Sequence, residues 1–202
     1  MKTKLYFLTV VLLASVLQLN AQNISFEQVF PEGSNPYFTA NFKGLSGSSI
    51  SLADIDLDND QDVIFTGFDG SMKPHTVLYI NEGSNGFSEV TDISLPNIKV
   101  GEAKFFDIDN DTDPDLIITG YEYTEKAYDR ITEIYINDGT GQFVEQAENN
   151  LSDIYHSTIH YCDVDNDNDL DLLLSGETSS YVEVTELYVN DGTGEFTLLL
   201  NE

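Results

Sequence analysis

Three segments of the chain repeat one pattern, in which aspartates alternate with other residues and an apolar run ending in glycine follows. They read DIDLDNDQDVIFTG from Asp54, DIDNDTDPDLIITG from Asp107 and DVDNDNDLDLLLSG from Asp163. A second motif follows each of them, namely LYINEGSNGF, IYINDGTGQF and LYVNDGTGEF. A repeat of about 50 residues predicts an array of similar units that bury their apolar faces against one another.

Each unit contains four short segments with the patterns of β-strands. Before the aspartates, SISLA, EAKFF and TIHYC alternate, which places Ile50 and Leu52 on one face of the first strand. After them, VIFT, LIIT and LLLS are continuously apolar, as in strands covered on both faces. A third strand ends in a tight-turn signal, and a fourth begins at Phe87, Phe143 or Phe196. The pattern predicts an all-β fold, a partial or truncated β-propeller with about three four-stranded antiparallel blades.

The N-terminus has the features of a signal peptide. Lys2 and Lys4 precede the apolar run LYFLTVVLLASVL, and Ala21 offers a small residue for cleavage. A membrane anchor is the less favoured alternative, because the run is shorter than the roughly 20 residues of a comfortable span. We expect a secreted or cell-surface protein with a signal peptide at 1–21, an N-terminal strand and seam loop at 22–44, and blades at 45–202, divided near 45–95, 96–150 and 151–202.

Three blades do not close a propeller, since closed rings have about four to eight. The segment SFEQV at 25–29 matches the start of the fourth strand of each unit, so it would complete a further blade. We therefore expect either a continuation of the chain or self-association to close the ring.

The charge of the chain excludes several classes of partner. Against 36 acidic residues it has 8 lysines and arginines, a formal net charge of −28, so it lacks the clustered cations that bind phosphates. We expect no nucleic-acid partner and no membrane insertion after signal cleavage. The single cysteine, Cys162, excludes an internal disulfide, and its alignment with Ala53 and Phe106 predicts a buried thiol.

Little in the sequence indicates an enzyme. Three histidines and one cysteine give few groups for acid-base or nucleophilic chemistry. His156 and His160 lie in a strand pattern, which favours surface or packing roles over a zinc pair. No phosphate-binding loop or dinucleotide fingerprint occurs. We expect a non-catalytic protein, unless a catalytic part belongs to a longer chain.

The alternating aspartates match the needs of a hard cation. Ca²⁺ takes about six to eight oxygens in a flexible shell, and a curled loop can present side chains from its positions 1, 3, 5 and 9 and a carbonyl from position 7. The expected side-chain ligands are Asp54, Asp56, Asp58 and Asp62, then Asp107, Asp109, Asp111 and Asp115, and then Asp163, Asp165, Asp167 and Asp171, with the carbonyls of Asp60, Asp113 and Asp169. The sequence therefore predicts up to three Ca²⁺ ions.

Other metal sites fit the loops less well. An EF-hand needs a bidentate glutamate at position 12 and flanking helices, whereas Phe65, Ile118 and Leu174 stand there in strand patterns. Zinc is disfavoured because the loops lack histidine and cysteine, and Mg²⁺ because it resists dehydration.

These motifs together resemble the FG-GAP and VCBS repeats, the calcium-loop blades of integrin-α-like propellers. The resemblance covers about residues 45–200 and implies a propeller with Ca²⁺ bound between the first two strands of each blade, on secreted or surface proteins that bind partners. The Phe-Gly and Gly-Ala-Pro signatures of the integrin version are absent, so the bacterial VCBS type is closer. Where the family favours glycine, the loops have Asn59, Thr112 and Asn168, and the β-branched Thr112 predicts strain and the weakest site in the second loop.

We expect a non-catalytic binding or adhesion module for a protein or a glycan. The alternatives are the scaffold of a carbohydrate-active enzyme and a calcium-rigidified spacer. The loop between the second and third strands of the middle blade carries Tyr121, Tyr123 and Tyr128 beside Lys126 and Arg130, which suits stacking on sugars or gripping a protein. An ordinary solvated loop, with its tyrosines folded onto the blade, is the other interpretation.

Overall fold

The computed structural model describes residues 42–123 and 128–201, all within one compact unit, Tyr37–Glu202. The strands are β1 (Ser46–Ala53), β2 (Asp62–Phe68), β3 (Pro74–Asn81), β4 (Phe87–Glu89), β5 (Ile98–Phe106), β6 (Asp115–Tyr123), β7 (Tyr128–Asn137), β8 (Phe143–Glu145), β9 (Ile154–Cys162), β10 (Asp171–Thr178), β11 (Glu183–Asn190) and β12 (Phe196–Asn201), with one 3-10 turn, η1 (Gly83–Asn85). The predicted signal peptide and the strand at 25–29 lie outside the described residues. None of the described residues forms a helix long and apolar enough to cross a membrane.

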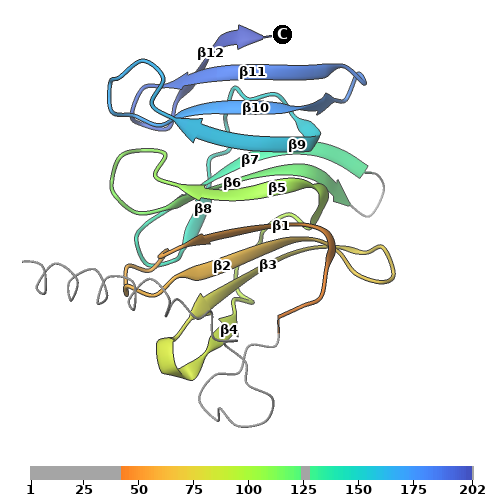
Figure 1. The fold of residues 1–202 in the computed structure, drawn as a ribbon, viewed down its shortest axis with the longest axis vertical. Helices are drawn as coiled ribbons and strands as arrows, with labels where there is room; N and C mark the ends of the chain where they lie inside the picture. Colours follow the sequence, from red (N-terminus) through yellow and green to blue (C-terminus); the bar gives the residue numbers. More distant parts are fainter. Residues whose placement is uncertain (1–41, 124–127, 202) are drawn as a thin grey trace, which may run out of the picture. The chain divides into compact units, whose positions relative to one another are not determined.

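All strand pairs are antiparallel and form two sheets (Figure 1). Strands β1 to β4 make the first sheet in chain order, and we call them the first repeat. Strands β5 to β8 form the second repeat and β9 to β12 the third, joined into one larger sheet by the pairing of Ile131 with Ile154. The prediction of an all-β fold is confirmed.

Register places the acidic loops and the glycine turns at one end of the strands. In the first repeat Ala53 pairs with Asp62, so the aspartate-rich loop joins β1 to β2. The turn between the third and fourth strands closes with Asn137 paired to Phe143 in the second repeat, and with the same pair of residue types elsewhere. Because neighbouring strands are antiparallel, the first and third connections of each repeat lie at the same end.

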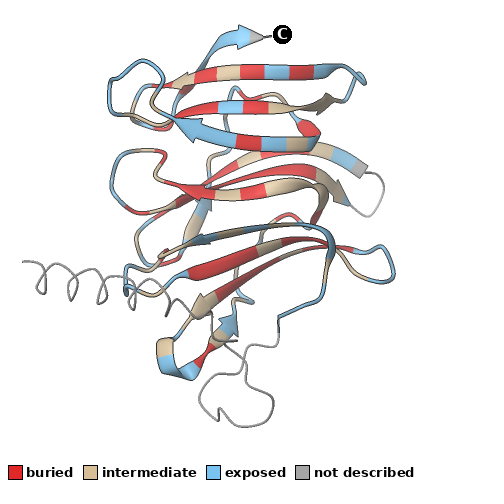
Figure 2. Cartoon of the chain, in the orientation of Figure 1, coloured by how far each residue is buried: buried red, intermediate tan, exposed pale blue. Residues whose placement is uncertain are grey.

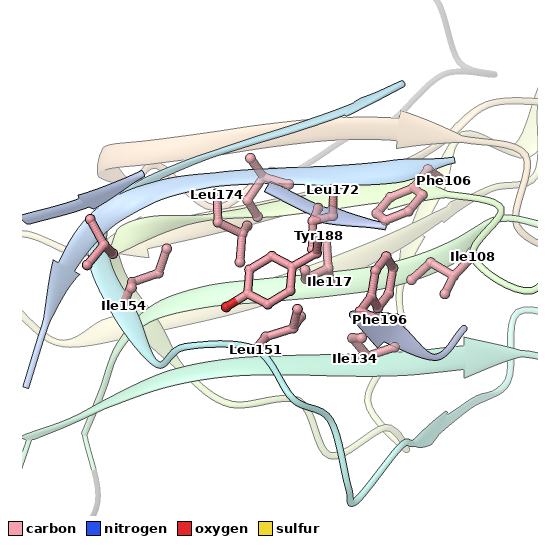
Figure 3. Close-up of a cluster of buried hydrophobic side chains, with 12 residues drawn as sticks. Phe106, Ile108, Ile117, Ile134, Leu151, Ile154, Leu172, Leu174, Tyr188 and Phe196 are labelled. Carbon is pink, nitrogen blue, oxygen red and sulfur yellow. The ribbon is translucent and has the colours of Figure 1, made fainter. Parts of the chain in front are cut away.

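The apolar core lies between successive repeats. Ile64 and Leu78 of the first repeat join a cluster with Phe105 and Leu116 of the second. A second cluster packs Ile117, Ile134 and Phe106 of the second repeat against Leu172, Leu174 and Tyr188 of the third (Figure 3). Burial of each such side chain stabilises the fold by about 1.5–3 kcal/mol. The repeats therefore stabilise one another, as the repetition predicts.

Some strand faces of the first and third repeats are exposed (Figure 2). Ile50 and Leu52 share one face of β1, as the alternation predicts, and they are 51% and 59% exposed. The LLLS strand, expected to be covered on both faces, leaves Leu173 39% exposed. These residues lie on the outward faces of the first and third repeats, which no other described repeat covers.

The prediction of a buried Cys162 is wrong, because the thiol is exposed. Its counterpart Phe106 is buried against the third repeat. Cys162 occupies the same face of the third repeat, where the described chain provides no further repeat to cover it. The alignment with Phe106 predicts the face of the sheet on which Cys162 lies. It does not predict whether another repeat covers that face.

Candidate metal centre

The ninth residue of each acidic loop is a buried aspartate that holds the loop in place. Asp115 Oδ2 accepts a hydrogen bond from the Ile108 N–H at 2.7 Å, and its Oδ1 accepts one from the Asn137 N–H at 2.8 Å. Asp62 and Asp171 accept the equivalent pair of hydrogen bonds in their repeats. Each of these carboxylates therefore ties the start of a loop to the end of the third strand.

The first aspartate of each loop accepts hydrogen bonds from the middle of the loop. Asp54 Oδ1 accepts one from the Asp58 N–H at 3.0 Å, and Asp54 Oδ2 accepts one from the Asn59 N–H at 2.9 Å. Asp107 Oδ2 accepts one from the Thr112 N–H at 3.1 Å. These bonds curl the backbone around its first residue, so that alternate side chains turn inward.

The curled loops bring carboxylates together. Within each group, one oxygen from every residue lies within 4.8 Å of the others, and the groups are Asp54, Asp56 and Asp58, then Asp107, Asp109 and Asp115, and then Asp163, Asp165 and Asp171. The other residues named as ligands lie outside these groups, namely Asp62, Asp60, Asp111, Asp113, Asp167 and Asp169. Each loop thus gathers three of its five predicted aspartates.

Several loop oxygens are buried without a hydrogen-bond partner. They are Oδ1 of Asp56, Asp107, Asp109 and Asp113. Buried polar atoms are nearly always paired, and leaving one unpaired costs about 1–3 kcal/mol. A cation among the carboxylates would satisfy these atoms. The groups contain only carboxylate oxygens, so the residues fit a hard cation rather than zinc.

Burial and like charge raise the pKa of the loop carboxyls. Burial raises the pKa of Asp115 to about 7, and its neighbour Asp109 adds to the shift. Burial likewise raises the pKa of Asp62 and of Asp113 to about 6. The pKa of Asp165 is also raised, by burial and by the charge of a neighbouring aspartate. Without a cation, Asp115 of the folded second loop therefore retains a proton up to about neutral pH.

The sixth residue of each loop has left-handed backbone geometry. Asn59, Thr112 and Asn168 have φ values of 74°, 82° and 80°. Asparagine adopts this region more readily than most residues, whereas a β-branched side chain is strained there. The strain predicted at Thr112 is present in its backbone.

The sequence did not reveal one further contact at the first and second acidic loops. The Asn137 Nδ2 donates a hydrogen bond to the carbonyl of Ile55 in the preceding repeat at 2.8 Å. The Asn190 Nδ2 donates in the same way to the carbonyl of Ile108 at 2.7 Å. The turn motif contained these asparagines, but nothing in the motif indicates that their side chains reach the previous loop.

A tyrosine cluster lies at the opposite end of the strands. The Arg130 guanidinium lies 5.1, 4.6 and 4.9 Å from the ring centroids of Tyr121, Tyr155 and Tyr181. Its Nη2 also lies 3.7 Å from Glu177 Oε1. The structure confirms that Tyr121 and Arg130 are neighbours, and it adds Tyr155 and Tyr181 from the third repeat, which the sequence did not indicate.

The structure describes only some of the other residues predicted for this loop. Tyr123 is exposed at the end of β6. Lys126 lies outside the described residues, and the structure does not describe the side chain of Tyr128.

The fold and the loops define a class of protein, the all-β repeat proteins with an acidic loop between the first two strands of each repeat. Comparison with family models gives matches to the FG-GAP-like repeat at residues 54–118 and 107–174. The chain belongs to this family. A search of curated proteins finds no match.

Acidification should stabilise the protein when a chelator keeps the loops free of cations. Asp62, Asp113 and Asp115 have folded-state pKa values above the ordinary value near 4, so the folded state binds more protons than the unfolded state between about pH 4 and 7. The melting temperature in EDTA should therefore rise as the pH falls from 8 to 5, measured by circular dichroism.

Asp115→Asn should reduce this pH dependence, whereas Asp92→Asn, which changes an exposed carboxyl outside the loops, should leave it intact. A melting temperature that falls between pH 8 and 5 in EDTA would contradict the assignment of raised pKa values.

Thr112→Asn should stabilise the protein. A left-handed backbone costs an ordinary residue about 1–2 kcal/mol, and asparagine less, so the free energy of unfolding should increase by about 1 kcal/mol. The reciprocal change Asn168→Thr, at the equivalent position of the third loop, should decrease it by a similar amount. Urea unfolding of both variants measures the change in the free energy of unfolding. If both variants were stabilised, or both destabilised, backbone strain at Thr112 would not be the explanation.

Proposed function

We propose that this chain is a calcium-binding, non-catalytic binding module built as part of a β-propeller and that it works outside the cell. The observation that carries the proposal is the set of buried, unpartnered carboxylate oxygens in the first and second acidic loops, together with the grouped carboxylates of all three. Membership of the FG-GAP-like repeat family supports a binding role.

Calcium suits these loops better than other hard cations. Ca²⁺ tolerates irregular shells of oxygen ligands, whereas Mg²⁺ requires near-octahedral geometry and keeps its water. The loops offer groups of three carboxylates. The predicted signal peptide at 1–21 would export the chain to a compartment where calcium reaches about 1 mM, which matches the weak affinities of extracellular modules.

Each ion would add a modest amount of stability. With dissociation constants of about 10⁻⁴–10⁻³ M and about 1 mM calcium, linkage gives roughly 0.4–1.4 kcal/mol per site. Three sites together would matter to a domain of this size, whose total stability is on the order of 5–15 kcal/mol.

Removal of calcium should lower the melting temperature by several degrees, and added calcium should restore it, because the ions bind the folded loops only. Calorimetric titration should give up to three sites per chain. The double change Asp163→Asn with Asp165→Asn should remove one site, since it neutralises two of three grouped carboxylates of the third loop.

Asp92→Asn is the matched control, because it removes one exposed charge and no grouped carboxylate, and it should bind calcium as the parent does. A melting curve that EDTA leaves unchanged, together with no calorimetric signal, would rule out the calcium proposal.

The tyrosine cluster is the surface that we propose for ligand binding. Tyr181 is 73% exposed and Tyr123 is 53% exposed, and both lie at the end of the strands opposite the acidic loops. Exposed tyrosines backed by an arginine are typical of protein interfaces, and tyrosine rings also stack on sugars. A ligand here would distinguish a binding module from a structural spacer.

Tyr181→Ala should weaken ligand binding by at least about tenfold, as expected for an aromatic anchor. The ligand would come from a screen of glycans and proteins, with and without calcium, followed by titration of the hit. Tyr161→Ala removes an exposed tyrosine elsewhere and should leave affinity unchanged. If no ligand binds in either condition, the spacer alternative is favoured.

A further inference from the structure

The two interfaces between repeats share one polar contact, which we call the asparagine latch. Asn137 and Asn190 are almost fully buried. Each donates from Nδ2 to a loop carbonyl of the preceding repeat, Ile55 or Ile108, and also to a carbonyl of its own repeat. The latch therefore marks how one repeat of this chain recognises the next.

The first repeat carries the donor half of a latch. Asn81 occupies the position of Asn137 and Asn190, and its Nδ2 donates to the Gln61 carbonyl of its own repeat at 3.2 Å. Within the described chain it has no second acceptor of the kind that Ile55 provides for Asn137. One donor of this amide is thus available to a preceding repeat.

The third repeat carries the acceptor half. Val164 occupies the position of Ile55 and Ile108, and its N–H donates to Asp171 Oδ2 at 2.7 Å, as those residues donate to their own ninth aspartates. The loop is therefore held in the same way in all three repeats. Val164 is 40% exposed, whereas Ile55 and Ile108 are 0% exposed.

The face of the third repeat that corresponds to the packed faces of the first two repeats is also apolar. In the first two repeats, three residues of the second and third strands face the next repeat, namely Ile64, Leu78 and Ile80, then Ile117, Ile134 and Ile136. Their counterparts in the third repeat are Leu173, Leu187 and Val189, which are exposed or half-buried. This tail face has the composition of a repeat interface but lacks its partner among the described residues.

The matching head face lies on the first repeat. Ile50 and Leu52 correspond to Ala103 and Phe105, which are buried against the preceding repeat. Ile50 and Leu52 remain exposed. The segment that leads into β1 nevertheless has the same conformation-fixing contact as its counterpart in the third repeat.

The segment that precedes β1 makes the same contact as the segment that precedes β9. The Lys43 N–H donates to Tyr79 Oη at 3.2 Å, and the Ser152 N–H donates to Tyr188 Oη at 3.1 Å. The head face is therefore built as it is in the third repeat, where it packs against a neighbour.

We propose that two copies of this chain associate head to tail, with the third repeat of one copy packed on the first repeat of the other. Asn81 of the second copy would donate to the Val164 carbonyl of the first, completing a third asparagine latch. The tail face and the exposed β1 part of the head face correspond to the two halves of an interface that already forms twice within the chain. The remainder of the head face, at Val63 and Tyr79, is already buried, with Phe42 packed on the Tyr79 ring. Such a heterologous contact continues into rings or short arrays.

Leu173→Glu on the tail face and Leu52→Glu on the head face should each keep the protein monomeric. Sedimentation analysis of the parent in about 0.15 M salt, where repulsion between the acidic copies is screened within roughly 8 Å, should show a mass that rises with concentration. Each variant should weaken association at least tenfold. Val144→Glu, at an exposed site on β8, should associate as the parent does.

Mixing the two variants is the decisive measurement. The Leu52→Glu chain keeps an intact tail face and the Leu173→Glu chain an intact head face, so the mixture should form a one-to-one dimer. Circular dichroism melts of each variant establish that it is folded. A parent that stays monomeric at all concentrations, or folded variants that stay monomeric when mixed, would overturn the proposal.

Discussion

The structure depends on one buried carboxylate in each repeat. Asp62, Asp115 and Asp171 each accept one hydrogen bond from the second residue of the acidic loop and one from the asparagine that opens the glycine turn. Two connections that are separate in sequence are thereby held together at one end of the strands. These two hydrogen bonds fix the positions of both ends of the acidic loop. The other aspartates of the loop are brought close together because the backbone between those two ends has to curl.

The same end of the strands also carries the contact between repeats. The asparagine whose N–H binds the buried carboxylate uses its side chain to reach the loop of the preceding repeat. One residue thus links the loop of its own repeat to the loop before it. A cation bound in one loop would therefore act close to the carbonyl that the next repeat contacts.

Repetition made most of the fold predictable. The acidic loops, the strands on either side of them and the positive φ at Thr112 follow from residues compared at equivalent positions. Burial was less predictable, because alternation assigns a residue to a face but does not say what covers that face. Cys162 was misjudged for this reason. The contacts of Asn137 and Tyr155 join different repeats, and a pattern within one repeat carries no signal for them.

Antiparallel topology separates the two candidate sites of the molecule. The first and third connections of each repeat lie at the loop end, so the connection between the second and third strands must lie at the other end. Arg130, Tyr155 and Tyr181 come together at that other end, and the grouped aspartates lie at the first. Occupancy of the acidic loops would therefore leave the tyrosines uncovered. The tyrosine cluster is made by two neighbouring repeats and therefore requires them to stay in register, and the loops and latches at the far end of the same strands provide that constraint.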